Sequence, residues 1–212
     1  MDTSQNVKYA LLTGFEPFGT PRPRDNRSWE TVKQLSGERI LAGGVTVVCH
    51  CHELPVSYGP VSELVPQLHL GKKYSIVIHC GAGSPGVVKL EGVAHRDGYS
   101  KQGNGGTKDV PDSGCVPGYS TTKKLSTSVN VDALKCTLAA NGWASVVTSQ
   151  NAGRYLCEFT YYTSLAEGET SYAKRQLPVP KTLFVHVPPK MQDPYSDSEL
   201  ADLVRDIIRN LA

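Results

Sequence analysis

The chain has 212 residues, of which 39% are hydrophobic and 20% charged, and its 22 Lys and Arg against 20 Asp and Glu leave a net charge of +2. At this length one core buries roughly 70% of the surface of the unfolded chain, so we expect one domain over residues 1–212 that is stable without metals or disulfides. The near-zero charge argues against nucleic-acid binding, and a polar Met1–Lys8 with no apolar run of about 18 residues argues against secretion and membrane insertion, so we expect a cytoplasmic protein.

Strand-like and helix-like segments alternate along the chain. Continuous apolar or β-branched runs predict strands, and apolar residues three and four positions apart predict helices. The expected strands are Tyr9–Thr13, Val45–Leu54, Ser75–Cys80, Ser145–Thr148 and Leu183–Val187, and the expected helices are Ser28–Leu35, Val61–Leu70, Val131–Ala140, Arg154–Leu165 and Asp197–Leu211. This alternation predicts a single-domain α/β/α sandwich around a mainly parallel, twisted sheet, as in phosphorylase-like and hydrolase-like folds.

Two long segments interrupt the alternation. Gly81–Asn130 is rich in glycine and has few helical signals, and an excursion of this length inside a compact domain is usually functional or partly mobile. Ala166–Lys181 mixes charged residues with Pro178 and Pro180, and we expect it to be a surface loop.

Cys49-His50-Cys51-His52 has the residue types of a metal site but ends a β-branched run that starts at Val45. Successive side chains of a strand point to opposite faces, so the cysteines and the histidines separate onto two sides of the sheet. No second ligand pair with zinc-finger spacing occurs elsewhere, and we expect a plain strand and no metal.

In open α/β sheets, ligands bind beyond the carboxyl ends of the strands, so residues that follow the predicted strands are candidates for a site. Gly14 and Gly19 bracket Phe15 and Phe18 after the first strand, and from this fragment alone we interpret the two aromatics as core plugs rather than pocket walls. Neither this loop nor Gly81-Ala82-Gly83 matches a P-loop or a dinucleotide fingerprint, which disfavours phosphate ligands.

Cys157 is the candidate nucleophile among six cysteines that, in a chain without a secretory leader, are interpreted as reduced thiols. It follows a predicted strand, the turn Ala152-Gly153 and Asn151, a candidate helix cap, so it lies near a helix N-terminus whose dipole and free amides favour a thiolate. The alternative is a small buried hydrophobic residue in the helix. His186 ends the next predicted strand, and because successive strands tend to be neighbours that share a crevice, the two side chains are expected to meet.

If His186 is the base, a third group should orient its imidazole. The alternative interpretation of His186 is a core histidine whose ring is hydrogen-bonded within the fold. Glu91 and Asp97 are the acids available in the loops of the crevice. Glu91 is a lone acid after Val87-Val88-Lys89-Leu90, which favours it over Asp97, beside Arg96 and Gly98, but by composition alone it is equally a surface charge.

Five segments that follow one another in order and span nearly the whole chain resemble the type I pyroglutamyl peptidases, also called pyrrolidone-carboxyl peptidases. They are Leu12–Gly19, Asn26–Trp29, Leu90–Glu91, Ser149–Cys157 with the following Phe159–Leu165, and Phe184–Pro189. The local sequences around Cys157 and His186 are most similar to those of the animal-type members.

The resemblance implies a cysteine omega-peptidase that removes an N-terminal pyroglutamyl residue from peptides through a thioester acyl-enzyme, with no cofactor and no metal. It implies that Cys157 is the nucleophile, His186 the general base and then acid, and Glu91 the residue that orients the imidazole. Five further positions fall on substrate contacts of the family. The resemblance places Phe15 and Phe18 on the aromatics that bind the lactam ring, which reverses the preference for core plugs, with polar contacts from the Ala82 backbone and apolar contacts from Tyr155 and Leu156.

Three features depart from the family pattern. Asn151 stands where close relatives commonly have Asp, Arg96 lies about where the family usually has Asn, and Ala166–Lys181 is longer than in the animal enzymes. None of them removes a member of the Cys-His-Glu triad, so we expect activity with an altered rate or pH optimum.

Two other classes are compatible with parts of the sequence. A catalytically weak or inactive relative that binds pyroglutamyl peptides would keep the fold and lack the activated thiol. A nucleoside-phosphorylase-like enzyme shares the architecture but needs a phosphate-binding cluster of Arg and Ser or Gly, which the sequence does not supply. Nothing in the sequence indicates an oligomeric state.

Overall fold

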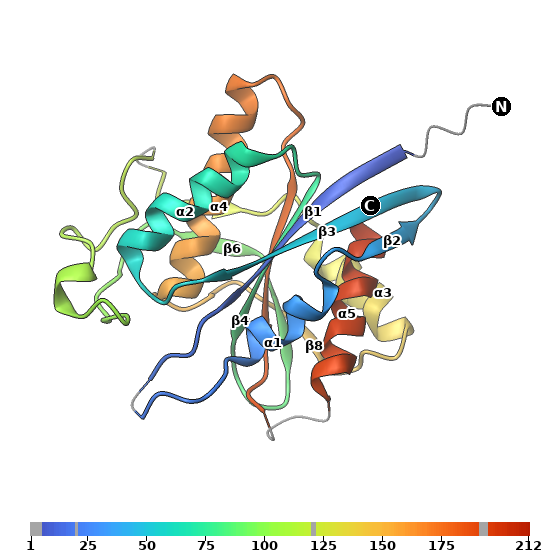
Figure 1. The fold of residues 1–212 in the computed structure, drawn as a ribbon, viewed down its shortest axis with the longest axis horizontal. Helices are drawn as coiled ribbons and strands as arrows, with labels where there is room; N and C mark the ends of the chain where they lie inside the picture. Colours follow the sequence, from blue (N-terminus) through green and yellow to red (C-terminus); the bar gives the residue numbers. More distant parts are fainter. Residues whose placement is uncertain (1–5, 20, 120–121, 191–194) are drawn as a thin grey trace.

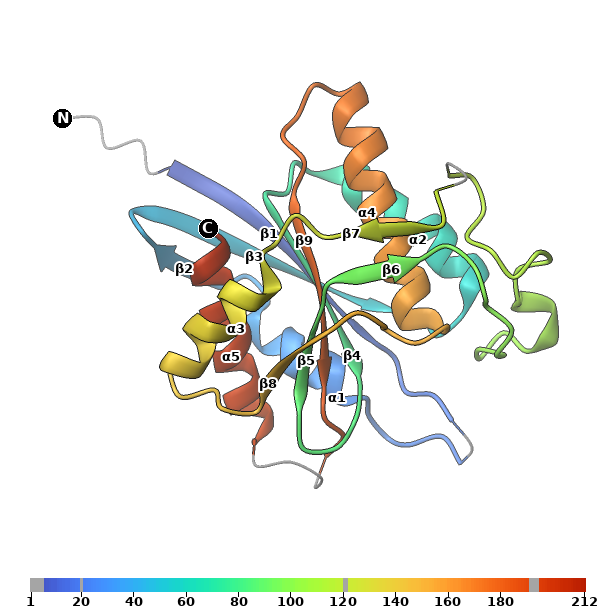
Figure 2. The same cartoon turned by 180° about the vertical axis from the view of Figure 1, so that it is seen from behind.

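The computed structural model describes residues 6–19, 21–119, 122–190 and 195–212, and within them seven strands form one mainly parallel sheet in the order β2-β3-β1-β4-β9-β5-β8. These strands are β1 (Asn6–Phe15), β2 (Arg39–Ala42), β3 (Val45–Leu54), β4 (Ile76–Ala82), β5 (Val88–Glu91), β8 (Val146–Ser149) and β9 (Lys181–Val187). The pairs β2–β3 and β5–β9 are antiparallel. Two further strands, β6 (Val93–His95) and β7 (Lys124–Ser126), pair with each other beside α4 and apart from the main sheet (Figure 2).

Helices cover both faces of this sheet. They are α1 (Arg27–Val32), α2 (Tyr58–Gly71), α3 (Val131–Ala140), α4 (Leu156–Lys174) and α5 (Asp197–Leu211), with short 3-10 turns at Lys33–Leu35 and Thr107–Asp109. Figure 1 shows α2 and α4 on one face and α1, α3 and α5 on the other. The predicted α/β/α sandwich around a mainly parallel sheet is therefore confirmed.

The alternation of side chains along the strands fills a separate core under each helical layer. Ile76 and Ile78 of β4 pack with Leu203 of α5, whereas Phe15 of β1 and Phe184 of β9 belong to the core shared with α4. All of these side chains are at most 3% exposed. Because both faces of the sheet are buried, its central strands are continuous apolar runs, as parallel sheets require.

Local sequence and packing agree in α5. Ser196 and Glu199 form a capping box, in which the Ser196 hydroxyl accepts from the Glu199 amide at 3.2 Å and the Glu199 carboxylate accepts from the Ser196 amide at 2.7 Å. Leu200, Leu203 and Ile207, spaced three and four residues apart, are fully buried against the sheet. This helix begins and ends where its sequence predicts.

The strand β3 places its cysteines and histidines as alternation predicts. Cys49 and Cys51 pack into the core on the side of α1 and α5, while the ring of His50 contacts Tyr9 and Tyr74 on the opposite face. Burial raises the pKa of the Cys49 and Cys51 thiols to about 12, so both stay protonated at neutral pH.

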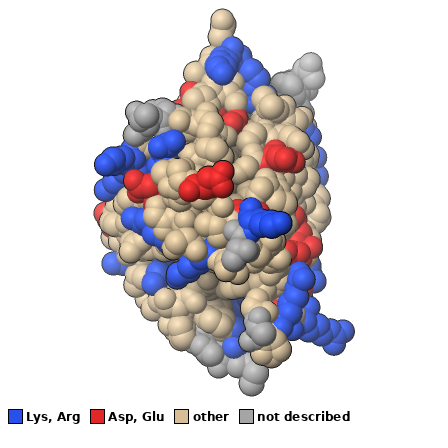
Figure 3. Space-filling view, turned by 90° about the vertical axis from the view of Figure 1, so that its left-hand side faces the viewer, with Lys and Arg blue, Asp and Glu red and all other residues tan. Residues whose placement is uncertain are grey.

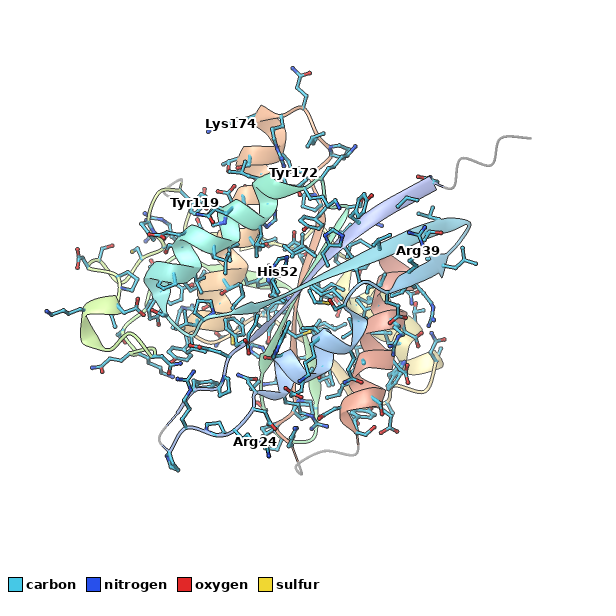
Figure 4. The ribbon with its side chains drawn as sticks, viewed as in Figure 1. Arg24, Arg39, His52, Tyr119, Tyr172 and Lys174 are labelled. Carbon is cyan, nitrogen blue, oxygen red and sulfur yellow. The ribbon has the colours of Figure 1, made fainter. Side chains whose placement is uncertain are left out.

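The prediction that Ala166–Lys181 is a surface loop was wrong for its first half. The helix α4 continues to Lys174, and Figure 4 shows Tyr172 and Lys174 on its last turns. Tyr172 is fully buried, and its hydroxyl accepts a hydrogen bond from the Tyr74 amide at 3.2 Å. This tertiary contact extends the helix through a charged stretch, and the chain leaves the helical path before Pro178.

The excursion Gly81–Asn130 contains three strands that the sequence analysis missed, β5, β6 and β7, of which β5 joins the main sheet. The short β5 inserts between β9 and β8, antiparallel to β9 and parallel to β8. Four residues in a glycine-rich segment are too few for a periodic signal, and the pairing partner is set by packing at a distance. The insertion decides which side chains meet at the site.

Asp109 fastens the middle of the excursion to the start of α2. Its carboxylate accepts from the Tyr58 amide at 2.7 Å and from the Gly59 amide at 2.9 Å. Ser57, at the N-cap position, makes no side-chain capping bond, so Asp109 satisfies the helix N-terminus from a remote part of the chain. Asn104 of the same excursion donates to the Glu16 carboxylate at 2.7 Å, which holds this segment beside the loop that follows β1.

Charges of both signs are mixed on the surface. On the face drawn in Figure 3, Lys and Arg alternate with Asp, Glu and uncharged residues. Among the residues that the structure describes, no helix has the length and apolar composition needed to cross a membrane.

Candidate active site

Cys157 occupies the second position of α4, directly above the carboxyl end of β4. A Cβ atom added to Gly81 would lie 2.8 Å from the Cys157 sulfur and 2.8 Å from Cζ of Phe184. Any side chain at position 81 would therefore push the sulfur out of place. The missing side chain of Gly81 lets the N-terminus of α4 approach the sheet.

His186 lies beside Gly81, because β4 and β9 run parallel with these two residues in register. Its side chain is only 9% exposed. A Cβ on Gly83 would lie 2.7 Å from Cβ of His186, so a second glycine leaves room for the histidine. The two glycines thus seat sulfur and imidazole next to each other.

Glu91 reaches His186 from β5, one of the strands that the sequence analysis missed. Glu91 pairs with Phe184 across the antiparallel β5–β9 ladder, so its carboxylate lies on the same face as His186 and diagonal to it. Oε1 of Glu91 accepts a hydrogen bond from Nδ1 of His186 at 2.8 Å, and the carboxylate is fully buried. The Tyr161 hydroxyl donates to the Glu91 carbonyl at 2.8 Å and holds the end of β5 in place.

The surroundings of His186 favour its charged form. Burial alone would lower the pKa of this imidazole, but hydrogen bonds with Cys157 and Glu91 and the negative charges of both groups outweigh burial and raise the pKa to about 9. Because Nδ1 is held by the carboxylate, the other ring nitrogen is the one available to sulfur. The imidazole of His186 is therefore protonated at neutral pH, beside the Cys157 sulfur.

The first turn of α4 presents backbone amides beside the sulfur. Tyr155, at the N-cap position, makes no side-chain capping bond, and Phe159 is the residue whose amide bonds the Tyr155 carbonyl, at 2.9 Å. The amides of Leu156 and Cys157 come earlier in the helix than the Phe159 amide and therefore have no acceptor within the helix. They point out of the helix start, where the helix dipole also favours negative charge. This end of the helix suits an oxyanion that forms next to Cys157.

The residues expected to bind substrate separate into exposed and buried ones. Phe18 is 37% exposed, with its ring centroid 6.0 Å from that of Tyr155. Phe15 and Leu156 are 3% and 1% exposed, and the Phe15 ring packs 6.5 Å from the Phe184 ring. Phe15 thus belongs to the core, as the loop sequence alone indicated.

Ala82 and Phe18 line a cavity of about 260 Å³ at the carboxyl end of β4. The other lining residues are Pro23, Asp25, Asn26, Arg27, Pro189 and Lys190. A larger hollow of about 520 Å³ lies at the amino ends of β1 and β4, between Asn6–Tyr9 and Lys72–Ser75. In parallel sheets ligands bind at the carboxyl ends, so the smaller cavity is the one that concerns this site.

Two expectations about the site need correction, and one choice left open by the residues is resolved. The strands that precede Cys157 and carry His186 are not neighbours, because β5 lies between β8 and β9. Asn151 does not cap α4, since its side-chain oxygen accepts from the Gly153 amide and from Arg154, each at 3.2 Å. Of the two candidate acids, Glu91 bonds His186, whereas Asp97 forms a β-bridge with Cys115.

Gly81, Gly83 and Tyr161 also shape the site but were not assigned a role from the sequence. The two glycines stood in a motif tested only for phosphate binding. Their position directly before a predicted loop was a usable signal, because glycine at a strand end often marks a close approach of other groups. Tyr161 gave no such signal.

Comparison with known proteins adds independent findings. Residues 8–200 match the sequence model of the family described as pyroglutamyl peptidase. Pyroglutamyl-peptidase 1 of Mus musculus is 34% identical over 209 residues, 98% of this chain and 91% of that protein, and a pyrrolidone-carboxylate peptidase of Thermococcus onnurineus is 31% identical, covering 84% and 82%. The crystal structure of pyrrolidone carboxyl peptidase from Fervidobacterium islandicum AW-1 superposes with a TM-score of 0.78 at 26% identity, covering 96% of this chain and 98% of that one.

Proposed function

The chain belongs to the pyroglutamyl peptidase family, and we propose that it hydrolyses N-terminal pyroglutamyl residues from peptides with Cys157 as nucleophile, His186 as acid and base, and Glu91 as the group that orients the imidazole. The observation that carries the assignment is the hydrogen bond of 2.8 Å between Glu91 and His186, with His186 in register with the glycine that seats the Cys157 sulfur. Nucleophile, base and orienting group in this relation form a triad for acyl transfer.

Acylation begins from the thiolate of Cys157 and the imidazolium of His186. The sulfur attacks the carbonyl carbon between the pyroglutamyl residue and the next residue, and the carbonyl oxygen becomes an oxyanion beside the amides of the first turn of α4. As the tetrahedral intermediate collapses, His186 donates its proton to the leaving nitrogen and the C–N bond breaks. The products are a thioester on Cys157, a neutral His186 and the shortened peptide.

Deacylation returns the enzyme to its starting state. Neutral His186 removes a proton from a water molecule, whose oxygen attacks the thioester carbon. The C–S bond breaks, pyroglutamic acid leaves, and Cys157 is again a thiolate beside an imidazolium. Glu91 holds the ring in one orientation through both steps. Reducing compartments keep thiols in the free form that this mechanism needs, which supports a cytoplasmic location.

The proposed substrate pocket selects the lactam by its lack of charge. The neighbouring rings of Phe18 and Tyr155 offer apolar faces for the flat lactam, and the backbone at Ala82, which lines a cavity together with Phe18, is available for polar contact. Phe15 and Leu156 are buried and would act on the substrate only through the residues that cover them. An ordinary N-terminal residue carries an ammonium group, and burying that group in such a slot without a partner is costly. Pyroglutamate has no such charge, because its amine is closed into the lactam.

The direct test compares fluorogenic amides of pyroglutamate, glutamine and proline. We expect fluorophore release from the pyroglutamyl amide, with kcat/KM at least about 100-fold above that for the other two, because both of those carry a charged amine. A protein that binds the pyroglutamyl amide without releasing the fluorophore would contradict hydrolysis and would support the alternative of a binding relative. Equal turnover of all three amides would contradict the lactam pocket.

The pH dependence of the reaction follows from the raised pKa of His186. Its proton, needed by the leaving amine, is kept until the pH rises through about 9, so we expect kcat/KM to hold across neutral pH and to fall as the pH rises past that value. An unperturbed histidine, with a pKa near 6.5, would place the fall about two units lower. A pH profile that falls between about pH 6 and 7 would contradict the imidazolium assignment.

A further inference from the structure

We propose that Arg154, Glu158 and His95 form a positioning unit that holds the first turn of α4, and with it the Cys157 sulfur, in one orientation toward His186. The inference rests on the proposed function, because it concerns how the nucleophile of that reaction is held. None of the three side chains touches the triad through a hydrogen bond of its own. Their effect is transmitted through the turn before α4 and through the backbone of its first turn.

Glu158 is the centre of the unit. It follows Cys157 directly, and its side chain is fully buried. Oε1 accepts from Nδ1 of His95 at 2.8 Å, and Oε2 accepts from Nη1 of Arg154 at 2.6 Å. A buried carboxylate is costly unless it is paired, so these two donors are needed to keep Glu158 where it is.

Comparison with α5 shows that Glu158 does not act as an ordinary helix cap. In α5, Glu199 occupies the third helical position and bonds back to the Ser196 amide in a capping box. Glu158 has the same position in α4, yet its carboxylate bonds Arg154 and His95 instead. The amide of the N-cap residue Tyr155, which this carboxylate would bond in a capping box, is therefore not taken up by it, and both carboxylate oxygens are used to hold Arg154 and His95.

Arg154 is held along its length. A Cβ on Gly98 would lie 3.1 Å from Cδ of Arg154, and the φ of +95° at Gly98 is one that side-chain-bearing residues rarely adopt. The guanidinium also donates to the side-chain oxygen of Asn151 at 3.2 Å, which in turn accepts from the Gly153 amide. Arg154 thus joins the turn after β8 to the helix that carries Cys157.

His95 connects the same helix to the strand that follows Glu91. The strand β6, which contains His95, begins two residues after Glu91. Between them lies Gly92, where an added Cβ would be 2.7 Å from Nε2 of Gln150 in the turn before α4. The backbone that carries Glu91 and the helix that carries Cys157 are therefore tied together on one side of His186.

The test replaces Arg154 with methionine, which keeps an apolar stem against Gly98 and removes the charge. We expect Arg154→Met to lower kcat for a pyroglutamyl amide by about 10- to 100-fold, with KM changed by no more than about threefold, because the displacement affects the chemical step rather than the ring pocket. The rate at which iodoacetamide alkylates Cys157 should fall in parallel. Arg154→Lys should recover part of the loss, since it restores one charged donor.

A second variant separates positioning from general damage. In Arg154→Met/Glu158→Gln the buried charge left without its arginine is removed, and we expect a smaller loss than in Arg154→Met alone. Arg209→Met is the matched control, because Arg209 pairs with Asp206 three residues away on α5, far from the site. It should leave kcat, KM and alkylation unchanged.

The outcomes distinguish this inference from the proposed function. If the parent protein turns over the amide and Arg154→Met keeps its kcat within about threefold, the positioning unit is contradicted. It is also contradicted if the loss only follows the unfolded fraction measured by thermal melting at the assay temperature. If the parent protein has no turnover, the proposed function fails, and the alkylation rates of the same variants then decide the positioning of Cys157 independently.

Discussion

Replacement of Cys157 with alanine is expected to lower kcat/KM for a pyroglutamyl amide by roughly 10⁴-fold or more, to the level of the uncatalysed reaction plus whatever binding alone supplies. The loss should fall on kcat, because the sulfur forms the covalent intermediate and is not part of the ring pocket. Alanine removes only the sulfur atom, at a position that is partly exposed, so the variant should remain folded. The measurement is steady-state kinetics together with thermal melting.

Cys136→Ala is the matched control for this substitution. Cys136 is an exposed cysteine on α3, which covers the other face of the sheet. Its removal should leave kcat and KM unchanged. Residual turnover in Cys157→Ala above about 1% of the parent value would show that another group is the nucleophile, and the proposed mechanism would have to be abandoned.

The structure also divides the remaining thiols by reactivity. Burial raises the pKa of Cys49, Cys51 and Cys80 to about 12, so these three are protonated at neutral pH and do not compete for alkylating reagents. Cys115 and Cys136 are at least partly exposed. Peptide mapping after brief alkylation therefore has three sites to distinguish, and the sulfur beside His186 should be modified first.

The sequence predicted the sandwich because its long elements carry strong periodic signals. Buried strands such as Ser75–Cys80 are continuous apolar runs, and Asp197–Leu211 combines an apolar face with a capping box. Two features depended on contacts between distant residues and could not be read from local pattern. They are the insertion of β5 beside β9 and the extension of α4 to Lys174.

The site shows the same division. Two of its residues, Cys157 and His186, were predicted from their positions, Cys157 at a helix start that follows one strand and His186 at the end of the next strand, and the two strands were expected to be neighbours. In the structure β5 separates those strands, and the side chains meet because α4 returns over Gly81, in register with His186. Periodicity could not choose Glu91 over Asp97, since the choice depends on the diagonal relation of Glu91 to His186 across an antiparallel ladder.

That diagonal contact leads to the second large effect, for Glu91→Gln. Glutamine keeps an oxygen that accepts from Nδ1 of His186 but removes the charge that supports the imidazolium. Burial lowers the pKa of His186, and Glu91 is one of the two groups that outweigh it, so the variant should have a His186 pKa below the present value of about 9. We expect kcat/KM at neutral pH to fall by roughly 10²- to 10⁴-fold, and its alkaline limb to move to lower pH.

The shift of the alkaline limb distinguishes an electrostatic role of Glu91 from a merely structural one, because loss of packing would lower the rate without moving the pH profile. Glu167→Gln supplies the control: this carboxylate is 7% exposed and bonds the Tyr119 hydroxyl on the outer side of α4, and the same substitution there should leave the profile of the parent. If Glu91→Gln lowers the rate but leaves the alkaline limb of the pH profile where it is, then Glu91 does not raise the pKa of His186. The limb would then report the interaction of His186 with Cys157 alone, since that is the remaining group that raises the pKa of the imidazole.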